Sequence, residues 1–238
     1  MPDVVNTLRF DGSTADFTQA FDCSNANYLL VGVISNATAG SEAVVEGMTF
    51  NGDALTQHVS ATHPFSIDTA RDIHLKWFGL SNPDQGEYDI AIDLTFPSAP
   101  ATGAQHYIAI ALSNVYTSNP VAGTDHDGQD ADDFPNPDLS ITKTLPGPSI
   151  GFMYGTIRPN AAGANYVTAS GTEIFDNQTV IGDNNGGKYC SYRKFQSAGT
   201  HALTATGSYD LAPAPDAHAE IGILLNGIPF AAQTITFD

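Results

Sequence analysis

The chain has 238 residues, of which 26 are acidic and 8 are basic, so its formal net charge is −18. A surface this acidic repels a phosphate backbone and excludes nucleic acid as a partner. Apolar residues make up 42% of the chain, which excludes wholesale disorder.

The acidic residues are 21 Asp and only 5 Glu. Asp favours turns and loops, whereas Glu and Lys fill exposed helix faces, so this balance argues against exposed helices. No apolar run reaches the roughly 18 residues of a membrane span, and we expect no membrane association. Residues 1–5 show no basic segment followed by an apolar one, so we expect no secretory signal peptide.

In chain order, residues 5–10 and 17–21 predict a short N-terminal strand pair, with 1–22 forming either an arm or edge strands. Residues 28–34 are almost wholly apolar, as in a strand buried on both faces. Residues 44–50 lead into Asn51-Gly52, a strong hairpin signal, and 54–61 form the predicted return strand.

The clearest strands follow. Ile73, Leu75 and Trp77 alternate with more polar neighbours, which predicts that Trp77 lies in the core. Residues 88–94 alternate in the same way, with Asp89 and Asp93 on a polar outer face. A further apolar strand is predicted over 107–112, and a long acidic loop over 123–138.

The second half shows the same pattern of short strand-like runs between turn residues, with strands expected at 139–143, 149–157, 172–175, 189–195, 201–205 and 220–225. About ten to thirteen short strands and no amphipathic helix indicate a sandwich or barrel. No repeat of about 20–50 residues occurs, which argues against a propeller or solenoid. We therefore predict one all-β domain over residues 1–238, an antiparallel jelly-roll-type β-sandwich with little or no helix.

The best metal candidate is the predicted acidic loop. Its carboxylates could supply the hard oxygen ligands that Ca²⁺ prefers, although the EF-hand spacing fails. The alternative is a solvated loop tip. The candidate calcium ligands are Asp125, Asp127, Asp130 and Asp132.

Two further features leave alternatives open. Cys23 and Cys190 have no metal-ligand spacing, and they are either two separate thiols or a disulfide that closes a long loop. Tyr189, Tyr192 and Phe195 follow a predicted hairpin tip and are candidates for contact with a partner or a glycan. No nucleophile motif or phosphate-binding glycine loop occurs, so we expect no enzyme, no catalytic residue and no other cofactor.

With the strands laid out, the chain resembles single jelly-roll domains of phage and archaeal-virus structural proteins and of bacterial surface proteins. The resemblance spans roughly residues 27–120 and is carried by segments 27–33, 48–56, 74–80, 82–86 and 111–115. It implies a sandwich that serves as a capsid, decoration, turret or fibre module, or as an adhesive module, with no shared catalytic residues.

These expectations lead to three functional hypotheses. The first is a non-catalytic virion component, in an outer capsid feature or a tail, that is assembled in the host cytoplasm and contacts other copies and other virion proteins. Its acidity suits the outside of a shell, away from the packaged genome. The second is a glycan-binding or adhesive module outside the cell or on its surface, where it would contact host glycans. The third is a polysaccharide-active enzyme.

Overall fold

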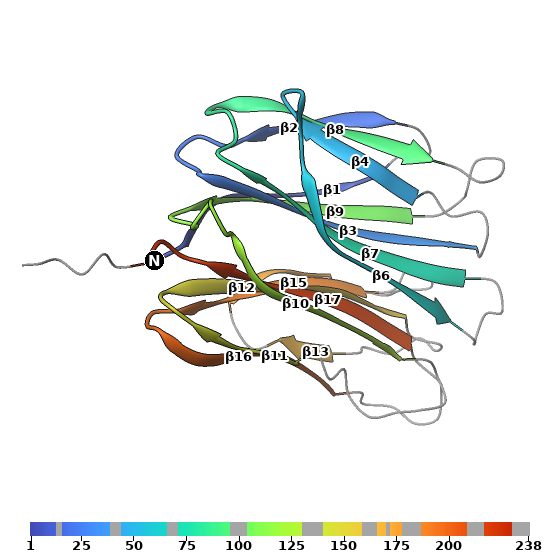
Figure 1. The fold of residues 1–238 in the computed structure, drawn as a ribbon. Helices are drawn as coiled ribbons and strands as arrows, with labels where there is room; N and C mark the ends of the chain where they lie inside the picture. Colours follow the sequence, from blue (N-terminus) through green and yellow to red (C-terminus); the bar gives the residue numbers. More distant parts are fainter. Residues whose placement is uncertain are drawn as a thin grey trace, which may run out of the picture.

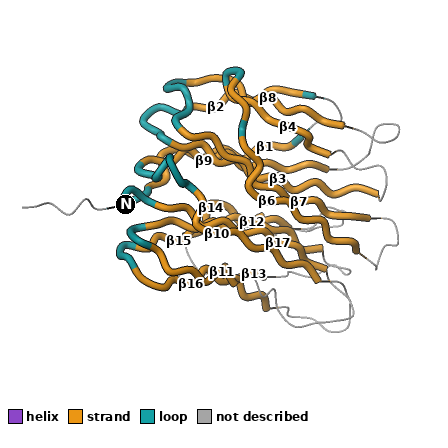
Figure 2. Tube along the Cα trace, viewed as in Figure 1, coloured by secondary structure: helices purple, strands orange, loops and turns teal. Residues whose placement is uncertain are grey.

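The structure is a computed structural model that describes residues 1–12, 16–38, 44–65, 71–95, 104–129, 140–158, 166–169, 172–177, 187–208 and 217–229. Its regular structure is entirely β-strand, and Figure 2 shows no helix among these residues. The predicted fold class, an antiparallel β-sandwich without helix, is confirmed for this part of the chain. None of the described residues forms a helix long and apolar enough to cross a membrane.

The first nine strands form two sheets, which we call the N-terminal unit. The inner sheet has the order β1-β9-β3-β7-β6, and the outer sheet has the order β2-β8-β4-β5. The strands are β1 (Asp3–Asp11), β2 (Phe17–Asp22), β3 (Tyr28–Thr38), β4 (Val44–Phe50), β5 (Asp53–Ala54), β6 (Thr56–Phe65), β7 (Arg71–Ser81), β8 (Glu87–Thr95) and β9 (Ala104–Ser113).

The remaining strands form the C-terminal unit. Its inner sheet has the order β10-β17-β12-β15-β14, and its outer sheet has the order β11-β16-β13. The strands are β10 (Val121–Gln129), β11 (Ser140–Leu145), β12 (Ser149–Arg158), β13 (Tyr166–Ala169), β14 (Thr172–Asn177), β15 (Gly187–Phe195), β16 (Gly199–Ser208) and β17 (Ala217–Asn226).

The two units have the same topology. Each strand of the first unit except β5 has a counterpart in the second unit. If β10 to β17 are written, in chain order, in place of β1, β2, β3, β4, β6, β7, β8 and β9, each sheet order of the first unit becomes that of the second. Within the first unit the pairs β1·β9, β2·β8, β3·β7 and β4·β5 are antiparallel and nested, as in a long hairpin rolled up on itself.

The four sheets stack as four layers, with the two inner sheets facing each other (Figure 1). In the interface between the units, β6 contacts β10, β7 contacts β17 and β3 contacts β12. β6 is one edge strand of its sheet, and β10 is the counterpart of β1, the strand at the opposite edge of that sheet. The contact between β6 and β10 is therefore the one expected if an approximate two-fold axis between the inner sheets relates the two units. The chain thus resembles a face-to-face dimer built from one polypeptide.

The described residues form three apolar cores, which fill the spaces between the layers. The central core lies between the inner sheets and contains Trp77, Tyr154 and Phe152, all fully buried. A second core, around Phe50 and Phe78, fills the N-terminal unit, and a smaller one fills the C-terminal unit. The inner sheets are therefore covered on both faces, as predicted for residues 28–34, and the predicted core position of Trp77 is confirmed.

The Asn51-Gly52 hairpin is also confirmed. Both residues have positive φ, 49° and 90°, as the two central positions of a type I′ turn require. Tyr88 departs from the predicted alternation, because it is exposed at the start of β8 and its ring packs edge-on against Phe50 at 5.9 Å.

Candidate functional site

The prediction of a loop over 123–138 is wrong for 123–129, which belong to β10. Asp125 and Asp127 lie within β10, opposite Gly222 and Glu220 of β17. Pairing with this strand keeps residues 123–129 extended despite their turn-like composition. Asp130 and Asp132 lie outside the described residues. Among the residues that the structure describes, no group of His, Cys, Asp and Glu is placed to hold a metal ion.

The disulfide alternative is wrong, since both cysteines are free. Cys23 lies in the core of the N-terminal unit and Cys190 lies in the central core, so an inner sheet separates them. Burial raises the pKa of Cys23 to about 12 and raises that of Cys190 well above its ordinary value. Both thiols are therefore protonated, unreactive core groups.

The predicted aromatic contact set does not form one platform. Tyr192 is half-buried and packs against Phe152 in the central core, with the ring centroids 5.8 Å apart. Phe195 is buried in the core of the C-terminal unit, on the opposite face of β15, and its ring stacks on His201. The side chain of Tyr189 lies outside the described residues.

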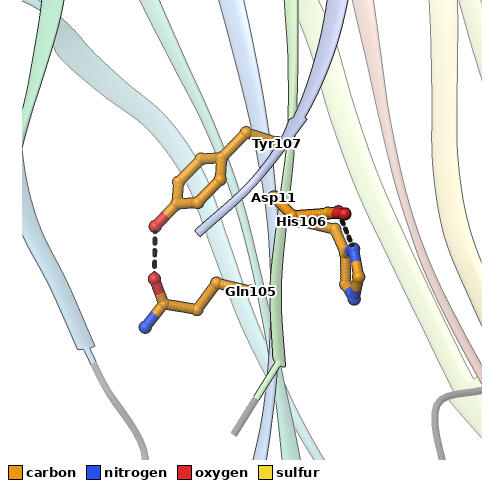
Figure 3. A network of polar contacts seen from close by, with 4 residues as sticks. All are labelled: Asp11, Gln105, His106 and Tyr107. Atoms are coloured by element: carbon orange, nitrogen blue, oxygen red, sulfur yellow. Dashed lines mark hydrogen bonds and ion pairs between the residues drawn. The ribbon is translucent and has the colours of Figure 1, made fainter. Parts of the chain in front are cut away.

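A group of polar side chains lies near the start of β9, on both faces of the strand. His106 of β9 and Asp11 of β1 are opposite each other in the sheet, and Nδ1 of His106 lies 2.6 Å from a carboxylate oxygen of Asp11 (Figure 3). On the other face of β9, the Tyr107 hydroxyl donates to the Gln105 side-chain oxygen at 2.7 Å. Since a carboxylate only accepts hydrogen bonds, Nδ1 of His106 carries the proton.

Two buried titratable groups, His106 and the nearby Lys188 of β15, have strongly perturbed pKa values. Burial lowers the pKa of His106 to about 4, and the positive charge of Lys188 adds to this effect, while Asp11 opposes it. Burial likewise lowers the pKa of Lys188 to about 8, with Asp11 again opposing. Perturbed groups often mark active sites, but here the side chains of His106 and Lys188 are packed between the two units. The arrangement joins the two units through buried side chains.

The outer sheet of the N-terminal unit carries an open groove of about 610 Å³, which we call the outer groove. Its floor is a row of small residues straight across four strands, because Thr18 pairs with Ala91, Ala91 with Thr49, and Thr49 with Ala54. Nothing in the described structure covers this sheet, which is the outermost layer in Figure 1. A second hollow of about 520 Å³ continues it along β8.

Carboxylates line both sides of the floor. Asp16, Glu46 and Asp93 line the main part, and Glu87 and Asp89 line the continuation. Among the described residues, neither lining contains a lysine or an arginine. Lys76 is close enough to Glu46 for their charges to attract, but its ammonium donates to the Val45 carbonyl at 2.7 Å. The outer groove is therefore a strongly negative channel with a flat floor.

The end of the molecule where the units join is apolar by contrast. Of the five large apolar side chains that are exposed among the described residues, four belong to segments that meet here, and we call this set the junction surface: Met1, Val5, Tyr116 and Ile228. Val115 bridges to Gly227, and this pairing places Tyr116 and Ile228 on the same face. In Figure 2 the loops of both units gather at this end, beside the N-terminus.

Sequence reasoning missed both surface features. The alternation of Asp89, Ala91 and Asp93 did indicate an outward face, but the row across neighbouring strands requires the register. The junction surface joins residues from opposite ends of the chain. Comparisons with protein-family models, with curated proteins and with solved structures find no match.

Proposed function

We propose that each unit is a jelly roll and that the protein is a non-catalytic structural component of a viral particle, in an outer capsid, turret, decoration or tail position. It works through contacts with other copies and other virion proteins and is assembled in the host cytoplasm. The nested strand pairs of the first unit and the resemblance over residues 27–120 support the fold and the setting. The junction surface is the observation that carries the role in assembly.

The junction surface suits protein–protein contact because it combines exposed apolar side chains with a paired charge at its rim. Tyr116 and Ile228 are 39% and 48% exposed, and burying the exposed part of each such side chain stabilises a contact by roughly 1 kcal/mol. At its rim, Asp3 is paired with Lys194. Two chains that each carry a charge of −18 repel each other least where charge is absent or paired.

The placement of the reactive groups supports a non-catalytic role. His106, Lys188 and Cys190 have perturbed pKa values, yet all three are buried between the units. The outer groove is open, and the described residues that line it are carboxylates, threonines, small residues and apolar side chains, with no histidine, cysteine or lysine among them. Binding and assembly require exposed surfaces such as the outer groove and the junction surface, and they do not require a reactive side chain.

The test compares the wild-type chain with a Tyr116→Ser/Ile228→Ser double variant, using Tyr88→Ser as a control for loss of exposed apolar surface elsewhere. We expect wild type and control to form concentration-dependent oligomers in sedimentation velocity and to co-sediment with gradient-purified particles. The double variant should lose both properties while keeping native Trp77 fluorescence. A strictly monomeric wild-type chain that is absent from purified particles would overturn the proposal.

A further inference from the structure

We propose that the outer groove binds an extended basic segment of a partner protein. Within the proposed function, that partner is another component of the particle, and this site is separate from the junction surface. The inference rests on the shape of the floor, on the negative charge of the walls and on the position of the sheet.

The shape fits an extended chain. Neighbouring strands are about 4.8 Å apart, so the four-strand floor is about 14 Å long, which matches about four extended residues. The floor residues Thr18, Ala91, Thr49 and Ala54 all lack long side chains, so a partner backbone can approach closely. The alternating side chains of such a segment would then reach the walls on either side.

The negative charge of the groove walls indicates that the bound segment is basic. Asp93 pairs with Gly47 on one side of the floor and Asp89 pairs with Ala20 on the other, so the two carboxylates flank the same row. Asp16 is held in place at one end, because its carboxylate accepts the Leu94 backbone N–H at 2.9 Å. Carboxylates on both sides of the floor attract lysine and arginine side chains and repel acidic segments.

A glycan fits the outer groove less well. Sugar binding commonly uses an exposed aromatic face. Among the described residues of the main lining the one aromatic residue is Phe17, which packs toward the core of the N-terminal unit. Tyr88 lies at the far end of the continuation and directs its ring against Phe50. A neutral oligosaccharide would also leave the carboxylates without counter-charges.

The experiment measures binding of fluorescein-labelled hexalysine to the full chain by anisotropy, with hexaglutamate and maltohexaose as alternative probes. Asp89→Asn/Asp93→Asn removes two charges from the groove, and Asp125→Asn/Asp127→Asn removes the same number from β10 of the other unit. Ala91→Trp fills the floor on an outward-facing position. Native Trp77 fluorescence checks the fold of the two asparagine pairs, and amide NMR dispersion checks that of Ala91→Trp.

We expect hexalysine to bind the wild type and the Asp125/Asp127 variant alike, and to bind the Asp89/Asp93 variant about fivefold or more weakly, since exposed ion pairs contribute modestly. Ala91→Trp should remove binding at the groove, and added salt should weaken it. If both asparagine variants lost hexalysine affinity equally, the binding would be attraction by net charge alone, and the proposal would be overturned. Binding of maltohexaose in place of hexalysine would also overturn it. Neither outcome affects co-sedimentation with particles, so the proposed function is tested separately.

Discussion

Acidification should weaken the joint between the two units through His106. The side chain is 11% exposed and its Nδ1–H is committed to Asp11, so an added proton must go to Nε2. That buried atom has no hydrogen-bond partner among the residues that the structure describes, and the charge of Lys188 disfavours a second positive charge nearby. The pKa of His106 in the folded protein is therefore about 4, against an ordinary value of 6.5.

The direction in which pH changes the free energy of unfolding follows from proton uptake by the folded and unfolded states. Between pH 6.5 and 4 the unfolded chain binds a proton at His106 that the folded chain does not, so the free energy of unfolding falls as the pH falls. At about 1.4 kcal/mol for each pKa unit, the loss reaches about 3 kcal/mol near pH 4. Above pH 6.5 the imidazole is neutral in both states and contributes no pH dependence.

Urea unfolding at a series of pH values, followed by the fluorescence of Trp77, measures this loss, because Trp77 is fully buried in the central core. His106→Gln keeps an amide donor for Asp11 but has no titrating group, so the variant should lose about 3 kcal/mol less than wild type between pH 6.5 and 4. Asp11→Asn should extend the loss to lower pH, since the carboxylate raises the pKa of His106. Parallel curves for wild type and His106→Gln would refute this account.

Three further predictions concern the same interior. The pKa of Lys188 is lowered from 10.5 to about 8, so stability should rise by up to about 3 kcal/mol between pH 8 and 10.5, and urea unfolding of Lys188→Met should lack this rise. Gly32→Ala places a Cβ 2.6 Å from the Trp77 ring and should cost about 1–3 kcal/mol, whereas Gly47→Ala meets nothing within 4 Å and should be nearly neutral in the same assay. Cys23 and Cys190 should react with a thiol reagent only after unfolding, at two thiols per chain and without prior reduction. Native reactivity of either thiol would contradict its burial.

Much of the strand pattern was predictable because period-2 alternation is local. The strand predicted at 44–50 coincides with β4, and the predictions at 149–157 and 220–225 lie within β12 and β17. β10 was mistaken for a loop because its side chains are polar and its extended form depends on the apolar partner β17. The four residues of β13 leave too short a pattern to recognise.

The surface features were not predictable for a different reason. The floor of the outer groove depends on the register of four strands, and one residue of slip in β4 would replace Thr49 by a buried neighbour. The junction surface needs Val115 and Gly227 to meet across more than a hundred residues. Neither relation leaves a periodic signal in the chain.

The stacking of the two units was nevertheless implied by the sequence. Residues 28–34 and 107–112 are continuous apolar runs, and the residues of these runs are buried whichever way they point. In a sandwich of two sheets each sheet has only one covered face, so alternating strands would suffice and such runs would expose every second side chain to water. Runs of this kind at the centre of a sheet require a further layer on the other face. In β3 and β9 that layer is the inner sheet of the second unit, whose β12 and β17 show the same double burial. The face-to-face stack is thus a requirement of the apolar runs, and a chain cut after Ser113 would leave Trp77, Ile108 and Ile110 uncovered.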